Sequence, residues 1–292
     1  KNEARFNLIV GGSVQSLIHK IFESNKEPLY NRQTAIIRVN KFPPSVLKEI
    51  LAYHNPNYTQ DDLLALYSFT GGVAKYVELL MDKGATTRSK MIETIVQADS
   101  IFLSEGKNLL IEEFGKDYGI YFSILTAIAS GHTQRSQIED MIGKEIGGYL
   151  TMLEDTYGII HKHKPLFTTK NSNIHYRLND NFLTFWFRFL FKYNHMLEIE
   201  AFEALRQIIE RDYETFSGKM LEQYFKEKLA EQQQFTRIDS WWSRNGESEI
   251  DVIAINEISK EAIFYEVKRQ SKDIDLSLLE QRSKDFLIAT RQ

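Results

Sequence analysis

The chain has 292 residues, a formal net charge of −4, no cysteine, and 42% hydrophobic residues, which is enough to bury two or three cores. The absence of cysteine excludes disulfides and thiolate zinc sites, and a pI of about 6.0 argues against a surface coated for nonspecific nucleic-acid binding. No signal peptide or membrane-length apolar span is visible in the sequence, so we expect a cytoplasmic protein with no membrane partner.

Two short apolar runs near the start are expected to form strands. Phe6 to Val10 is followed by Gly11-Gly12 and Ser13, and Ala35 to Val39 follows a loop that carries Arg32. Apolar runs of this length, bounded by turn residues, are typical of strands. The simplest interpretation of Arg32 is a loop arginine that meets solvent.

The next segment, from Asn40 to Glu112, has a helical pattern throughout. Pro43-Pro44-Ser45 gives an N-terminal signal for its first helix, and Tyr58-Thr59-Gln60-Asp61-Asp62 gives another. Gly71 and Gly72 interrupt the pattern, and taken alone they predict a turn between two helices.

The middle of the chain predicts a winged helix-turn-helix. Three helical patterns precede two short strands that are separated by a Pro- and Asn-containing turn: Tyr118 to Ser130, Thr133 to Ile142, Ile146 to Asp155, Ile159 to Lys164, and His175 to Leu178.

The charge distribution leaves two interpretations of this unit open. The third helix is acidic, with Glu145, Glu154 and Asp155 against Lys144, which favours a structural spacer or a protein-contact module over a DNA reader. The wing is basic, which keeps phosphate contact through the wing open: His161, Lys162, His163, Lys164, Lys170. His161 and His163 have metal-ligand spacing but no evident third ligand, so we expect them on a solvated wing face.

Three helices are expected to follow the wing. Phe182 to Tyr193 is aromatic but too short to span a membrane and contains charged residues, so it predicts a core helix. Glu198 to Tyr213 predicts a connecting helix. Ser217 to Glu231 has an apolar stripe of Leu221, Phe225 and Leu229, and Glu222 lies at the edge of that stripe.

The last third of the chain carries the pattern with the clearest chemistry. Glu249 to Ile255 predicts a strand with Asp251 on one face, and Ala262 to Lys268 predicts a second strand with Glu266 and Lys268 on a shared face. If the two strands are neighbours, Asp251 and Glu266 can hold one hard cation such as Mg²⁺ or Mn²⁺. The alternative is that these residues are solvent-exposed charges on strand edges.

Such a cation would activate a water for attack on a phosphodiester. Lys268 would orient that water or stabilise charge on the phosphorus oxygens, and Glu222 is the best candidate for a further carboxylate.

The segment from about Thr215 to Gln281 resembles the C-terminal PD-(D/E)xK nuclease-like domain of the archaeal-type AAA/STAND ATPase family. The residues that carry the resemblance are Gly218, Glu222, Trp241-Trp242, Glu249-Ile250-Asp251 and Glu266-Val267-Lys268. Ile250 stands where the proline of the motif's name would be. The resemblance implies catalytic roles for Glu222, Asp251, Glu266 and Lys268, with Asp251 and Glu266 as the metal ligands.

Upstream motifs resemble the ATPase part of the same family, which implies a nucleotide-binding role for four residues. Ser13 would be the sensor 1 hydroxyl, and Arg32 would reach nucleotide phosphate across a subunit contact, which implies a homo-oligomer. Gly71 and Gly72 resemble the sensor 2 region, although Ala74 replaces its usual proline.

The family resemblance implies an α/β multidomain fold. Its parts would be the C-terminal strands of an AAA-type ATPase core (1–42), a helical lid (43–112), the winged helix-turn-helix with the aromatic helix (113–200), and the nuclease-like domain (201–292). The sequence lacks the P-loop pattern G-x-x-x-x-G-K-[ST] and begins with Lys1, so we expect a C-terminal portion whose ATP-binding motifs lie upstream and which does not hydrolyse ATP by itself.

The sequence leads to two functional hypotheses, one for an enzyme and one for an interaction protein. The first is a Mg²⁺- or Mn²⁺-dependent nuclease, a hydrolase that cuts DNA or RNA under ATPase control. The second is a nucleotide-regulated switch or interaction protein in which the nuclease fold is a non-catalytic docking module. The intact acidic and lysine residues favour the first, and the missing basic track favours the second.

Overall fold

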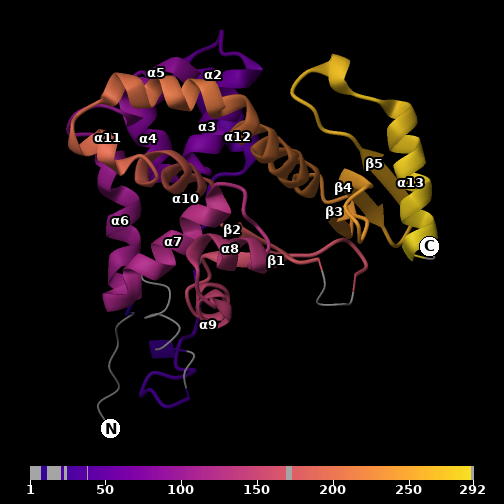
Figure 1. Ribbon diagram of the computed structural model, residues 1–292, viewed down its shortest axis with the longest axis horizontal. Helices are drawn as coiled ribbons and strands as arrows, with labels where there is room; N and C mark the ends of the chain where they lie inside the picture. The colour runs from indigo at the N-terminus through magenta and orange to yellow at the C-terminus, as the bar shows by residue number, and fades with distance from the viewer. Residues whose placement is uncertain (1–7, 12–20, 23–24, 38, 169–172, 291–292) are drawn as a thin grey trace.

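The computed structural model describes residues 8–11, 21–22, 25–37, 39–168 and 173–290. These residues form a mostly helical protein with two small antiparallel sheets, one of two strands and one of three (Figure 1). Helices therefore dominate the described chain more than the expected α/β class implies. No helix among the described residues combines the length and the apolar character needed to cross a membrane.

The expected helical region after residue 43 is confirmed. Its helices are α2 (Pro44–His54), α3 (Gln60–Thr70), α4 (Ala74–Asp82), α5 (Arg88–Ile95) and α6 (Ile101–Phe114). Pro44 stands at the start of α2, where its fixed φ fits a first turn, and Thr59 and Asp62 form a reciprocal capping box at the start of α3. Two of the sequence signals thus begin the helices that they predicted.

The predicted turn at Gly71 and Gly72 is also confirmed. Gly71 ends α3 in the left-handed region with φ +60°, and Gly72 has φ +79°. A Cβ on Gly72 would lie 2.2 Å from the carbonyl oxygen of Phe42, whose N–H donates to the Gly72 carbonyl at 2.7 Å. The glycine therefore allows two backbone segments to approach each other closely.

The elements expected between residues 118 and 178 are all present. They are α7 (Tyr118–Ala129), α8 (Arg135–Ile142), α9 (Gly147–Thr151) with a π-helical continuation η2 (Met152–Thr156), β1 (Ile160–His163) and β2 (His175–Leu178). The two strands pair antiparallel, with Ile160 opposite Leu178 and His163 opposite His175. Three helices followed by a hairpin is the predicted order.

The aromatic segment lies in the core, as its composition predicted. It forms α10 (Asn181–Phe185) and a π-helical stretch η3 (Trp186–Phe191). Phe182, Phe185 and Trp186 are all at most 3% exposed, and they pack in one large core with residues of α3, α6 and α7. This core joins the first helices to the segment that carries the hairpin.

One long helix, α12 (Phe202–Glu231), links that helical core to the second sheet (Figure 1). The expected connecting helix and the expected first helix of the last domain are therefore a single element. Its first half buries Leu205, Ile209 and Tyr213 in the large core, and its last turns place Leu229 against the sheet. Phe225, expected in the buried stripe, is 37% exposed, because the buried face near this end runs instead through Lys226 and Leu229.

The second sheet has the order β3–β4–β5, with β3 (Arg237–Trp242), β4 (Glu249–Asn256) and β5 (Glu261–Tyr265). Both ladders are antiparallel, and β4, the central strand, is buried on both faces. Leu229 of α12 packs with Val252 and Ala254, and the C-terminal helix α13 (Leu276–Thr290) adds Phe286 to a cluster with Ile250 and Ile253.

The strands expected at the start of the chain are not formed by the described residues. Residues 8–11, 35–37 and 39 have no regular structure, and Ile9, Ile37 and Val39 are 85 to 94% exposed. A short strand needs a partner strand and a buried face, and the described residues supply neither to these runs. Phe6, Gly12 and Ser13 lie outside the described residues.

Candidate active site

Asp251, Glu266 and Lys268 meet at the end of the second sheet. The Lys268 ammonium Nζ lies 3.0 Å from Asp251 Oδ2 and 2.8 Å from Glu266 Oε1. The side chains of Asp251 and Glu266 are 9% and 4% exposed, so the two acids are held inside the protein and are not solubilising surface charges. The structure therefore brings together the acid and lysine residues that the sequence singled out.

The local geometry differs from the expected shared strand face. β5 ends at Tyr265, which pairs with Val252, so Glu266 and Lys268 lie just beyond the strand. The physical reason is that the Val267 N–H donates to Asp251 Oδ2 at 2.8 Å, in place of a ladder partner on the neighbouring backbone. The Asp251 side chain thus draws the chain after β5 toward itself.

Two cations neutralise the buried acids. Besides Lys268, the Arg282 guanidinium on α13 lies 3.2 Å from Glu266 Oε2. Burial lowers the pKa of Lys268, but its hydrogen bonds to Glu266 and Asp251 outweigh that effect and raise the pKa above its ordinary value. Lys268 therefore remains an ammonium at neutral pH.

Glu222, on α12, faces the same region without joining this ion-pair cluster. Burial, together with the negative charge of Asp251, raises the pKa of Glu222 to about 7, although the charge of Arg177 on β2 opposes the shift. A carboxyl with a pKa near neutrality can hold or accept a proton at physiological pH. The raised pKa of Glu222 therefore suits proton transfer.

Replacing Glu222 with glutamine is expected to change how stability depends on pH. The folded-state pKa lies above the ordinary glutamate value, so the folded protein binds the proton more tightly than the unfolded chain does. The stability that the Glu222 carboxyl contributes to the folded protein is therefore present at low pH, and it is lost as pH rises from about 4.5 to about 7.

Glutamine does not titrate, so the Glu222→Gln variant does not show this loss of stability with rising pH. Urea unfolding at pH 5 and pH 8 should show that the stability of the variant, relative to the parent, rises between the two values. A constant difference would contradict the raised pKa. Glu247→Gln, an exposed glutamate on the turn between β3 and β4, is the matched control.

The residues present fit a divalent cation of the Mg²⁺ type. Within the described ranges, no cluster of three or more His, Asp or Glu side chains forms a closed metal cage. Mg²⁺ does not require one, because it is held by one or two carboxylates together with water and substrate phosphate. Asp251 and Glu266 already place oxygens around one cationic group, the Lys268 ammonium, so the two acids can face a shared cation.

Three of the four predicted nucleotide-binding residues lie among the described residues: Arg32, Gly71 and Gly72. Ser13 lies outside the described residues. Arg32 is exposed, and its backbone N–H donates to the Leu29 carbonyl at 3.2 Å. Gly71 and Gly72 face protein backbone at Asn181 and Phe42, so their contacts agree with the helix-turn interpretation.

Three residues near the site carry polar contacts that the sequence patterns did not reveal. Lys226 of α12 has a side chain 9% exposed and donates to Asp239 Oδ1 at 3.0 Å and to Ser240 Oγ at 2.6 Å. His163 of β1 contacts the same Asp239 oxygen at 2.8 Å and is 5% exposed. The solvated wing face expected for His163 is therefore wrong, because the hairpin packs against the second sheet there.

A second missed cluster ties the segment after Lys268 to α3. The Arg269 guanidinium donates to Asp61 Oδ1 at 2.6 Å and to the Ser217 hydroxyl, and it lies 5.0 Å from the Tyr213 ring centroid. Arg88 lies over the same ring at 4.9 Å and also pairs with Asp61. No pattern in the sequence indicates this cluster, because Asp61 and Arg269 are 208 residues apart.

Parts of the chain are similar to known proteins. Residues 186–287 match the family DUF234, described as "Archaea bacterial proteins of unknown function". An uncharacterized protein of Methanocaldococcus jannaschii is 30% identical in an alignment over 287 residues that covers 94% of this chain. The chain spans 62% of the length of that curated relative. No solved structure matches the chain.

Proposed function

We propose that this chain carries a metal-dependent nuclease site, which hydrolyses phosphodiester bonds in nucleic acid, and that an ATPase module controls the site in the complete protein. The observation that supports this most is the contact of one ammonium, Lys268 Nζ, with both Asp251 and Glu266 inside the protein. Residues from two separate motifs are thereby held in one place.

The arrangement of the elements supports the fold part of the proposal. A three-stranded sheet packed between α12 and α13 is compatible with the proposed nuclease-like α/β domain, with Asp251 on the central strand and Glu266 just after the edge strand. Helices α7 to α9 followed by the hairpin β1–β2 suit a winged helix-turn-helix. ATP binding, homo-oligomer formation through the ATPase module and a cytoplasmic location belong to the same proposal.

The chemistry assigns a role to each residue. Asp251 and Glu266 would hold Mg²⁺ or Mn²⁺, which when bound supplies polarisation of the phosphate and a more acidic water. Lys268, kept charged by its two acids, stabilises negative charge on the phosphorus oxygens. Glu222, with a pKa of about 7, takes up the proton of the attacking water as the bond from phosphorus to the leaving oxygen breaks.

One observation favours the second hypothesis, a non-catalytic docking module. Lys268 and Arg282 already neutralise both acids, and the described residues offer no third metal-binding side chain beside them. A site stabilised in this way would hold the segment after β5 in place without binding a metal. Arg269, the next residue, then joins that segment to α3 through Asp61.

Titration of the chain with Mn²⁺ separates the two hypotheses. The nuclease proposal predicts saturable binding with one ion per chain by isothermal titration calorimetry, and loss of that binding in Asp251→Asn. Asp275→Asn, an exposed residue in the same domain, should bind as the parent does. Equal heats from the parent and Asp251→Asn would favour the docking module.

A further inference from the structure

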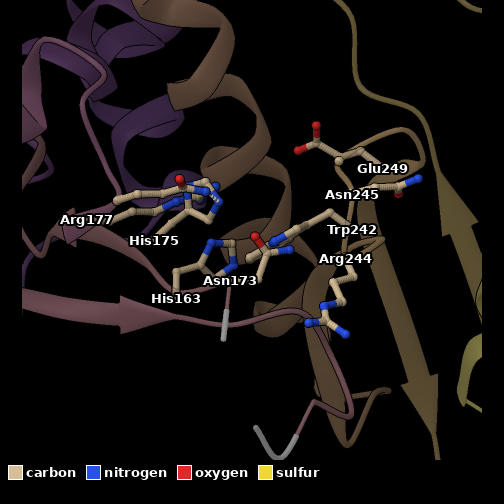
Figure 2. Close-up of a pocket in the computed structure, with 10 residues that line it drawn as sticks. His163, Asn173, His175, Arg177, Trp242, Arg244, Asn245 and Glu249 are labelled. Carbon is tan, nitrogen blue, oxygen red and sulfur yellow. Dashed lines mark hydrogen bonds between the residues drawn. The ribbon is translucent and has the colours of Figure 1, made fainter. Parts of the chain in front are cut away.

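A cavity of about 290 Å³ lies where the hairpin β1–β2 meets the turn between β3 and β4 (Figure 2). In the hairpin register His161 is opposite Arg177 and His163 is opposite His175, so these four side chains share one face of the hairpin. Figure 2 shows His163, His175 and Arg177 on one side of the cavity and Trp242 and Arg244 on the other. Asn173 closes part of the gap by donating to the Ser243 carbonyl at 3.2 Å.

The charges of the lining are mainly positive and unpaired. Among the described residues, neither Arg177 nor Arg244 forms an ion pair or a side-chain hydrogen bond, and Arg177 is only partly exposed. Glu249 is the single acid of the lining. Burial lowers the pKa of His175, and the charges of Arg177 and Lys219 lower it further, so positive potential dominates this wall. An unpaired, partly buried guanidinium calls for an anion.

Two buried polar atoms of the lining also lack partners. Trp242 is 8% exposed and its indole Nε1 donates to no group in the described structure, and the same holds for Nδ1 of His163. Because Asp239 is an ionised acceptor on the Nε2 side of His163, Nε2 carries the proton and Nδ1 is left as an acceptor. Buried polar groups are nearly always satisfied, so a ligand with an anionic oxygen and a donor suits this cavity.

The cavity lies next to the candidate active site. Glu249 lines the cavity, and Asp251 of the carboxylate cluster lies two residues further along β4. The cavity and the carboxylate cluster are therefore neighbours along this strand. A strand of nucleic acid that presents one phosphate to the acids would present a neighbouring phosphate nearby.

We propose that this cavity binds a backbone phosphate of the nucleic-acid strand that the carboxylate site cleaves, with Arg177 and Arg244 as its ion-pair partners and the Trp242 indole N–H as a neutral donor. The proposal rests on the proposed function and names where its substrate is held. The volume of the cavity is at the lower limit for small-molecule pockets. Such a volume suits one phosphate with part of its sugar and not a whole base pair.

Fluorescence anisotropy with a labelled single strand, as RNA and as DNA, tests this in EDTA so that no cleavage occurs. The double variant Arg177→Gln/Arg244→Gln should bind at least about tenfold more weakly than the parent, and the slope of log affinity against log salt should fall by about 0.7 for each phosphate that the variant no longer binds. Arg237→Gln, at the other end of β3 and paired with Glu257, removes the same charge away from the cavity and should match the parent. A double variant that binds like the parent overturns the proposal.

Two further measurements distinguish failure of the phosphate-binding proposal from failure of the nuclease proposal. Inorganic phosphate should shift the indole N–H resonance of Trp242, identified by its disappearance in Trp242→Phe, and an unshifted resonance counts against the cavity. A parent that binds strands through the arginines but never cleaves them with metal supports the cavity and rejects the nuclease. A double variant that cleaves as fast as the parent rejects the cavity and leaves the nuclease standing.

Discussion

Replacing Lys268 with alanine is expected to lower the rate of metal-dependent phosphodiester cleavage by about 10²- to 10³-fold, the usual effect of removing one donor that stabilises charge in a transition state. Lys268 contacts both acids of the site, and no other lysine does so among the described residues. Cleavage of a labelled strand under single-turnover conditions measures the effect.

Binding of Mn²⁺ should survive in Lys268→Ala, because the variant keeps Asp251 and Glu266 and removes the cation that lies between them. A variant that no longer cleaves but still binds the ion therefore assigns Lys268 to the chemical step. Lys284→Ala is the matched control, since this lysine is 59% exposed on α13 and pairs only with Glu280. Cleavage by Lys268→Ala at the parent rate would contradict the assigned role.

The second large effect is expected at the junction of the hairpin with the second sheet. Asp239 accepts hydrogen bonds from Lys226 and His163, and both of these side chains are at most 9% exposed. Removing the acid in Asp239→Ala leaves a buried ammonium with only the Ser240 hydroxyl as its partner. We expect a decrease of about 2–4 kcal/mol in the free energy of unfolding, because breaking one side of a buried pair leaves an uncompensated charge.

Removing the other partner of this pair should lower the free energy of unfolding by less. Lys226→Met removes the buried charge and keeps an apolar side chain of similar length, and the Asp239 that remains is 38% exposed and can be solvated. The double variant Lys226→Met/Asp239→Ala should then be more stable than Asp239→Ala alone. Urea denaturation of the three variants gives the comparison, and a Lys226→Met variant that is less stable than Asp239→Ala would contradict it.

Local signals in the sequence predicted most of the helices. The proline at the start of α2, the capping box at Thr59 and Asp62, and the glycine that ends α3 act within one helical turn, and each lies where a helix begins or ends. The hairpin strand His175 to Leu178 was also predicted with its observed bounds. Such features depend on neighbouring residues, and the sequence displays them directly.

Contacts between distant segments could not be predicted in this way. The strands expected at Phe6 to Val10 and Ala35 to Val39 have an apolar composition typical of strands, but their described residues find no pairing partner. The prediction of two separate helices, Glu198 to Tyr213 and Ser217 to Glu231, was wrong. No proline interrupts α12, and Gly218 is tolerated within it. His163 was expected in solvent because nothing in its own strand reveals the Trp242 and Asp239 that cover it.

The candidate site shows both cases. The proximity of Asp251, Glu266 and Lys268 was expected from two strands that pair as neighbours, and the structure places them together. Arg282, which pairs with Glu266, comes from a helix whose sequence gives no sign of the contact. Arg177 was likewise missed, because its influence on Glu222 runs between the hairpin and α12. The roles of these residues in catalysis stay predictions.

The central claim is that the acids and lysine of the second sheet form a working nuclease site. The most direct test is cleavage of labelled single-stranded and duplex DNA and RNA by the purified chain in Mg²⁺ or Mn²⁺, beside Asp251→Asn and an EDTA control. Metal-dependent cleavage by the parent that disappears in Asp251→Asn and in EDTA is the predicted result. Intact substrate in every lane, or equal cleavage by the parent and Asp251→Asn, would contradict it.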